Sequence, residues 1–316
     1  MNAYVLYRPK SRYWGADLIS CGISDALNSF GINSTYLPID DNVGLKPNDI
    51  GRKDLVLSMS DGPLFSLARK GKIKRGTFVL FNFDETLESE SYWRFWCSKT
   101  EKVKNLFGDK LRCMLDYSPR ANEKDDYFNS IDVIREFCPL GYSEKFEIRK
   151  EFNESLDCAF LGRWGNGKRE RRSDIIKVLN DSFRVSCIDK RYLTYISNSS
   201  VDRVDVVAKL LDSKVWLHVN RYENFDSFPD IRIIVYGMCN KVCIVSENVD
   251  WSPPFVNGIH WFCCSLKDIN DYCLFLIGNK QLRIKMANAA YDFIRENWRL
   301  DVMLKKALTS AGIIDG

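Results

Sequence analysis

The chain has 316 residues, of which 45% are apolar and 13% aromatic, so it can bury a large core and is long enough for two domains. Its formal net charge of +4 is far below the excess of a dedicated nucleic-acid coat protein, so charge alone names no partner. No stretch reaches the roughly 20 apolar residues of a membrane helix, and the eleven cysteines form no CxxC pair. We expect a cytoplasmic protein with reduced thiols and neither a membrane span nor a metal site.

The first half of the chain alternates short apolar runs with longer polar or amphipathic stretches. Apolar residues recur every three or four positions between residues 16 and 30, which predicts a helix that Gly31 ends. Short runs rich in β-branched and aromatic residues predict strands at 3–7, 34–38, 55–59, 77–81, 112–115 and 133–137. This alternation is typical of a parallel sheet with helices on both faces.

The periodicity lapses over residues 139–152, where a proline, a glycine and mixed charges are typical of a crossing between domains. A second alternating series follows, with strands at 156–161, 185–188, 215–219, 242–245 and 259–263, helices at 168–179, 201–211 and 266–277, and a helical tail from 280 onward. We therefore predict an α/β protein of two Rossmann-like domains facing across a cleft. The expected bounds are 1–142, 143–298 and a tail at 299–316.

One candidate site follows the strand at 156–161, in the sequence FLGRWGNGKRERRSDII. Cations at the amino end of the next helix are unfavourable by a few tenths to about 1 kcal/mol each, so an anion is expected beside them. A diphosphate on exposed amides and on Arg163, Lys168 or Arg169 would supply it. The alternative is a solvated basic helix whose arginines pair with Glu170 and Asp174, because the spacing matches neither a Walker loop nor GxGxxG.

A second candidate site lies between the strands at 215–219 and 242–245, where a polar loop leads into a helix expected to open at Pro229. The carboxyl end of a parallel strand is where open α/β sheets bind ligands. Glu223 or Asp230 can accept hydrogen bonds from sugar or ribose hydroxyls, and Arg232 can offset phosphate charge. The alternative is that the acids only cap the helix and pair with Arg232.

A third candidate is the acidic loop after the strand at 77–81, within LFNFDETLESESYW. An acid just past the carboxyl end of a strand is well placed to take a proton from an acceptor hydroxyl. The alternative is a solvated loop of four acids.

Taken together, the quoted stretches and the terminal YDFIRENWRLDVML resemble the C-terminal half of GT-B glycosyltransferases, over about half of the chain. The resemblance implies transfer of a sugar from a nucleotide-sugar such as a UDP- or GDP-sugar, without a further cofactor or a bound metal. It implies that Gly162, Arg163, Lys168 and Arg169 hold the donor diphosphate. It also implies that the segment from Glu223 through Asp230 to Arg232 holds the sugar and ribose.

A narrower similarity is to the DNA β-glucosyltransferases of T-even phages, in which a catalytic aspartate follows a comparable strand. This similarity implies that Asp84 is the base of an inverting transfer, to a hydroxyl on a glycan or on modified DNA.

Two residues depart from the family pattern: Val235 stands where a ribose-binding glutamate is usual, and Asn240 where a glycine is usual. Either Glu223 or Asp230 takes over the ribose contact, or the donor differs, or activity is lost. A catalytically inactive nucleotide-sugar-binding protein is therefore an alternative. Another is a nucleic-acid-binding protein that uses the basic run at 168–172.

Overall fold

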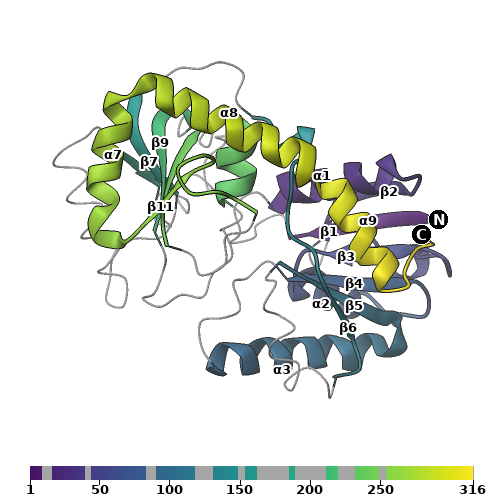
Figure 1. The fold of residues 1–316 in the computed structure, drawn as a ribbon. Helices are drawn as coiled ribbons and strands as arrows, with labels where there is room; N and C mark the ends of the chain where they lie inside the picture. The colour runs from purple at the N-terminus through teal and green to yellow at the C-terminus, as the bar shows by residue number, and fades with distance from the viewer. Residues whose placement is uncertain are drawn as a thin grey trace. The chain divides into compact units, whose positions relative to one another are not determined.

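The computed structural model describes residues 1–8, 16–39, 44–82, 90–117, 131–148, 154–161, 185–188, 211–219, 232–248 and 254–315 (Figure 1). The chain divides into two compact units. The first comprises residues 1–145 together with 299–316, and the second comprises residues 146–298. Each unit is built on a parallel sheet, as the alternating apolar pattern predicts.

The first unit has a six-stranded sheet with the order β2-β1-β3-β4-β5-β6. Its strands are β1 (Asn2–Tyr7), β2 (Asn33–Pro38), β3 (Leu55–Ser58), β4 (Thr77–Asn82), β5 (Leu111–Asp116) and β6 (Ile134–Phe137). Every neighbouring pair is parallel. Its helices are α1 (Ala16–Ser29), α2 (Asp61–Arg69), α3 (Glu90–Phe107) and α9 (Leu300–Ser310). The carboxyl ends of these strands, where the sequence predicts the catalytic base, therefore lie at one edge of the sheet.

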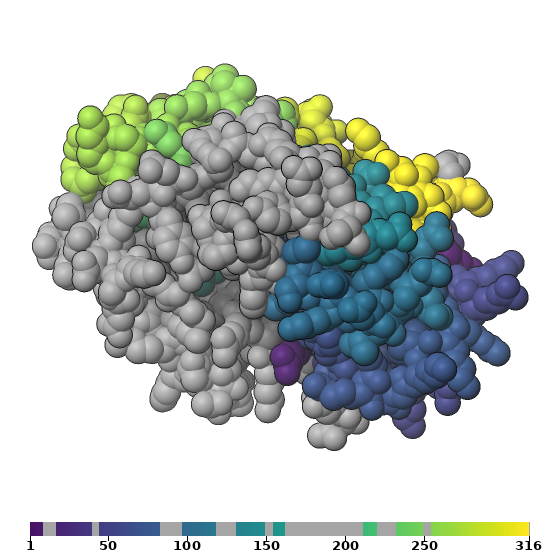
Figure 2. All heavy atoms as spheres, turned by 90° about the horizontal axis from the view of Figure 1, so that it is seen from below, coloured from purple at the N-terminus to yellow at the C-terminus, as the bar shows by residue number. Residues whose placement is uncertain are grey.

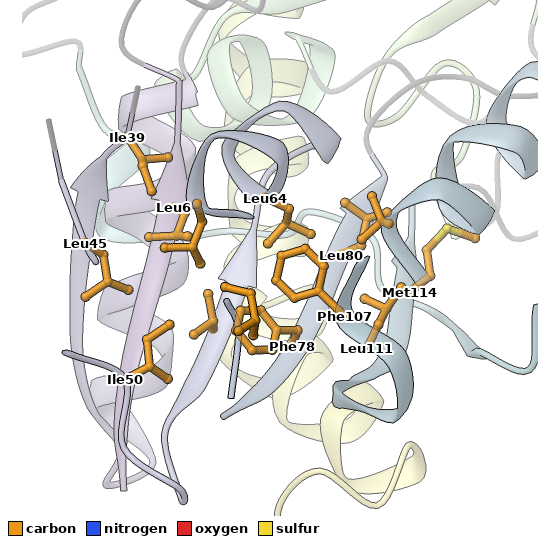
Figure 3. Packing of buried hydrophobic residues seen from close by; sticks show 14 of the residues in the cluster. Leu6, Ile39, Leu45, Ile50, Leu64, Phe78, Leu80, Phe107, Leu111 and Met114 are labelled. Carbon is orange, nitrogen blue, oxygen red and sulfur yellow. The ribbon is translucent and has the colours of Figure 1, made fainter. Parts of the chain in front are cut away.

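The core of the first unit lies between the sheet and its helices. β3 and β4 read as continuous apolar runs because they are covered on both faces, and Leu57, Phe78 and Leu80 are fully buried. The rings of Phe78 and Phe107 pack with centroids 4.6 Å apart, which fixes the end of α3 against β4 (Figure 3). Helix α9 packs against α1 and β6. This core holds the sheet edges in a fixed register.

The second unit has a five-stranded sheet with the order β11-β10-β9-β7-β8. Its strands are β7 (Leu156–Leu161), β8 (Val185–Ile188), β9 (Ser213–His218), β10 (Cys243–Glu247) and β11 (Phe262–Cys264). All neighbouring pairs are again parallel. Alternate residues of β9 and β10, among them Val215, Leu217 and Val245, enter a cluster with α7 (Ile269–Gly278). The intervening residues Trp216 and His218 therefore face the other side of the sheet.

Three local features differ from the expectation. The loop expected after the strand at 77–81 was to include Glu90, but α3 already begins at that residue. The helical tail is two helices, α8 (Lys280–Asn297) and α9, separated by the non-helical Trp298 and the extended Arg299. The helix expected from Pro229 is, where the structure describes it, a π-helical turn at Ile233–Gly237 followed by a 3₁₀ turn at Met238–Asn240.

Candidate functional site

The carboxyl edge of the first sheet carries polar residues at two neighbouring strand ends. Asn82 ends β4, Asp116 ends β5, and the two are register partners. Both side chains are buried, with exposed fractions of 1% and 0%. The Tyr117 N–H donates to the Asn82 carbonyl at 3.1 Å, so the pairing continues past the strands. Asp84, the predicted base, follows Asn82 by two residues and lies outside the described residues.

Asp116 forms an ion pair with Arg135 of β6 at the same edge, with Nη2 and Oδ2 3.1 Å apart. Side-chain exposure is 0% for Asp116 and 6% for Arg135, so the charges interact with little screening by water. The sequence reasoning missed this pair. The sequence did contain an indication of this pair, because Asp116 follows the strand predicted at 112–115. Asp84 was selected for a similar position, just past the end of a strand.

In the second sheet, Arg232 lies beside the carboxyl end of β7. Its Nη1 donates to the carbonyl of Leu161, the last residue of that strand. Leu161 immediately precedes Gly162, where the predicted phosphate loop begins. Arg232 and the last residue of β7, 71 positions apart in sequence, therefore meet at this edge.

His218 and Ser246 are register partners at the ends of β9 and β10, on the face opposite α7. His218 Nδ1 lies 3.0 Å from Ser246 Oγ, and Ser246 Oγ donates to the Glu247 carbonyl at 2.8 Å. A serine has one hydroxyl hydrogen, so Ser246 accepts from Nδ1, which must carry a hydrogen. His218 is therefore a buried histidine with a hydrogen-bond partner, and Ser246 is that partner.

The two departures from the family pattern have separate structural explanations. Val235 is fully buried within the π-helical turn. Asn240 uses its side chain as a clamp. Its amide donates one hydrogen to the carbonyl of Phe146 (2.9 Å) and shares the other between the carbonyls of Tyr236 (3.1 Å) and Val235 (3.2 Å), and its Oδ1 accepts from the Ile148 N–H (2.6 Å). A glycine at position 240 would make none of these bonds.

The other predicted donor residues lie outside the described part of the chain. They are Gly162, Arg163, Lys168, Arg169, Glu223 and Asp230. Among the residues that the structure does describe, no three His, Cys, Asp or Glu side chains are grouped to hold a metal ion. Within the same residues, no helix combines the length and apolar character needed to cross a bilayer.

No family model matches the chain, and no curated protein matches it in sequence. Solved structures do match over nearly the whole length. HepE of Anabaena in complex with UDP and glucose has a TM-score of 0.60 at 11% identity, covering 99% of this chain and 100% of HepE. An alpha-glucosyltransferase in complex with UDP and a 13-mer DNA containing an HMU base has a TM-score of 0.61 at 10% identity, covering 99% of each chain.

The sucrose-phosphate synthase of Thermosynechococcus elongatus is also similar, with a TM-score of 0.55 at 9% identity, covering 98% of this chain and 99% of that one. These proteins are GT-B glycosyltransferases. The chain has the GT-B fold. The fold predicted from the sequence resemblance is therefore confirmed. The DNA-containing neighbour is an alpha-glucosyltransferase, whereas the narrower sequence similarity was to a β-glucosyltransferase.

Proposed function

We propose that this protein is a glycosyltransferase that moves a sugar from a nucleotide-sugar to an acceptor hydroxyl. The observation that supports the proposal is the bond from Arg232, a predicted donor residue, to the carbonyl of Leu161, which directly precedes the predicted phosphate loop in sequence. Ligand binding at the carboxyl ends of parallel strands is the rule for open α/β sheets. UDP is bound in HepE and in the alpha-glucosyltransferase, which favours a UDP-sugar as the donor.

The proposed chemistry divides between the two sheet edges. At the first, Asp84 takes the proton of the acceptor hydroxyl as that oxygen attacks the anomeric carbon. At the second, the backbone amide at Gly162 with Arg163, Lys168 and Arg169 stabilises the negative charge of the departing nucleoside diphosphate. Glu223 and Asp230 accept hydrogen bonds from donor hydroxyls, and Arg232 balances phosphate charge. These residue roles need no metal ion.

The acceptor is proposed as a hydroxyl on a glycan or on a modified DNA base. The DNA-containing alpha-glucosyltransferase supports the second of these. Ten of the eleven cysteines, all but Cys187 of β8, are free thiols in the structure, which supports a cytoplasmic location.

A thermal-shift screen with UDP, GDP and their sugars tests the donor part of the proposal. We expect UDP and at least one UDP-sugar to raise the melting temperature, because a ligand that binds only the folded state stabilises it. Donor hydrolysis, followed as release of UDP, then tests activity. Failure of every nucleoside diphosphate and sugar-nucleotide to shift the melting temperature would contradict the proposal.

A catalytically inactive sugar-nucleotide-binding protein is the second candidate, favoured by the burial of Val235 where an acid is usual. It would show the thermal shift with UDP but neither hydrolysis nor transfer. Screening glycan and hydroxymethylated DNA acceptors with a UDP-sugar donor separates the two candidates.

A further inference from the structure

Five exposed cations lie in the two loops that precede β3 and β4 of the first unit: Arg52, Lys53, Lys72, Lys74 and Arg75. β3 and β4 are neighbouring parallel strands, and the Thr77 N–H donates to the Asp54 carbonyl at 2.8 Å. The two loops therefore lie side by side at the amino edge of the sheet. We call these five residues the basic edge. Part of the surface formed by residues 52–75, coloured indigo to blue, faces the viewer in Figure 2.

Core contacts hold the loops of the basic edge in place. Ile73 is 8% exposed and belongs to the same buried cluster as Ile50, so it anchors its loop between two exposed lysines. Gly76, at the end of the same loop, has a φ of +92°, and a Cβ there would lie 2.6 Å from Ile50 Cγ2. The backbone at Gly76 therefore packs directly against the core. The cations are therefore presented on an ordered surface.

The acids near these loops are already used within the protein. Asp54 Oδ2 accepts from the Gly51 N–H at 2.7 Å, and Asp49 Oδ2 accepts from the Lys46 N–H at 3.1 Å. None of the five cations of the basic edge forms an ion pair within the part of the chain that the structure describes. Like charges held close together repel at low ionic strength, and a polyanion relieves that repulsion.

The chemistry of the surface favours a phosphate backbone over a lipid surface. A membrane-binding surface presents large apolar side chains for insertion, but the large apolar residues of these loops, Leu45, Ile50 and Ile73, are all buried. The cations precede two strands that run about 4.8 Å apart, which brings several of them within reach of neighbouring phosphates on one strand of a nucleic acid.

We propose that the basic edge binds the phosphate backbone of a nucleic acid. The site is separate from the predicted transfer site, because a six-residue strand such as β4 sets its two ends roughly 17 Å apart. Its residues are also different from those of the basic run at 168–172. The proposal does not depend on glycosyl transfer, since it concerns binding in the absence of any sugar donor.

Fluorescence anisotropy with a labelled DNA duplex, the full chain and no nucleotide tests the proposal. We expect binding that weakens between about 50 and 200 mM salt by roughly threefold for each cation that contacts a phosphate. The variant Lys72→Gln/Lys74→Gln/Arg75→Gln should lose most of the affinity and show a shallower salt dependence. The control Lys102→Gln/Lys305→Gln/Lys306→Gln removes the same charge from exposed positions of the same unit and should bind nearly as the wild type.

Two outcomes would overturn the proposal. One is that the Lys72/Lys74/Arg75 variant binds DNA as strongly as the wild type, or that the control variant loses as much affinity as this variant does. The other is no measurable DNA binding at low salt, including the case in which the protein instead binds phosphatidylserine vesicles. The UDP thermal shift, measured on the same samples, reports separately on the proposed donor site.

Discussion

The side-chain amide of Asn240 holds the carbonyl of Phe146 at 2.9 Å, across 94 residues of sequence. Phe146 is the first residue of the second unit, so the clamp fixes the entering chain against the turn that carries Val235. The residue that departs from the family pattern here is therefore a structural one.

We predict that Asn240→Gly, which restores the residue usual in the family, destabilises the second unit by about 2 to 4 kcal/mol. The buried carbonyl of Phe146 and the amide of Ile148 would lose their partners. Chemical denaturation measures the effect. Asn279→Ala, which removes an exposed N-cap bond to Leu282, is the control and should cost about 1 kcal/mol. Equal stability of Asn240→Gly and the wild type would show that the clamp contributes nothing.

Arg232→Ala should weaken UDP-sugar binding about tenfold or more, because a charge-assisted contact near the diphosphate is lost. Isothermal titration calorimetry measures the dissociation constant. Arg295→Ala removes an exposed arginine from the same unit and should leave binding unchanged. A melting temperature near that of the wild type shows that loss of the Leu161 bond has not unfolded the unit. Unchanged affinity in a folded Arg232→Ala would argue against a donor role.

Asp84→Asn should lower kcat by about 100-fold to 10,000-fold while UDP-sugar affinity stays the same, since the amide cannot take the acceptor's proton. Transfer assays under saturating donor measure kcat. Glu85→Gln and Glu88→Gln, in the same acidic loop, serve as controls and should keep most of the activity. Full activity in Asp84→Asn would assign the base elsewhere.

Asp116→Asn should destabilise the first unit by about 3 to 5 kcal/mol, because it leaves the buried guanidinium of Arg135 without its carboxylate. The exposed pair of Arg299 and Asp301 provides the comparison, with Asp301→Asn expected to cost about 1 kcal/mol or less. Denaturant titration distinguishes the two. A similar small cost for both variants would mean that burial does not strengthen the Asp116 pair.

The second unit should lose stability as the pH falls below about 6.5, because burial lowers the pKa of His260. Its Nδ1 accepts from the Val256 N–H at 2.9 Å, which requires an unprotonated nitrogen. The contribution is present above the unfolded pKa and is lost as the pH falls through the folded pKa. Melting temperatures between about pH 7.5 and 5.5 should fall less steeply in His260→Asn, whose amide oxygen can still accept that bond. Parallel pH profiles would exclude His260 as a source of the dependence.

The sequence predicted most strands because buried parallel strands are short apolar runs that stand out from their surroundings. The run at 156–161 matches β7, and the run at 77–81 falls one residue short of β4. Helix α3 was missed because its acidic start, Glu90, continues the preceding acidic loop without a proline or glycine between them. The sequence also did not predict that the helical tail from 280 onward is interrupted at Trp298, because the residues on both sides of Trp298 favour helix.

For the candidate site, sequence named Arg232 as a donor residue but could not show that it reaches Leu161, which depends on the neighbouring strand order. The sequence could not predict the pair of Asp116 and Arg135 for the same reason, because the pair depends on β5 and β6 being neighbours. Val235 and Asn240 were noted as departures, but only three-dimensional packing distinguishes a lost ligand from a residue with a structural role.

The first unit is discontinuous in sequence, since α9 packs on α1 and the Leu300 N–H donates to the Tyr142 carbonyl at 2.9 Å. During synthesis on the ribosome, the second unit is an unbroken stretch and can finish folding as soon as it has emerged. The first unit emerges earlier yet must wait for α9 to cover the apolar face of α1. The half of the protein that is made first is therefore completed last, and its uncovered helix is exposed to chaperones and proteases for the whole interval.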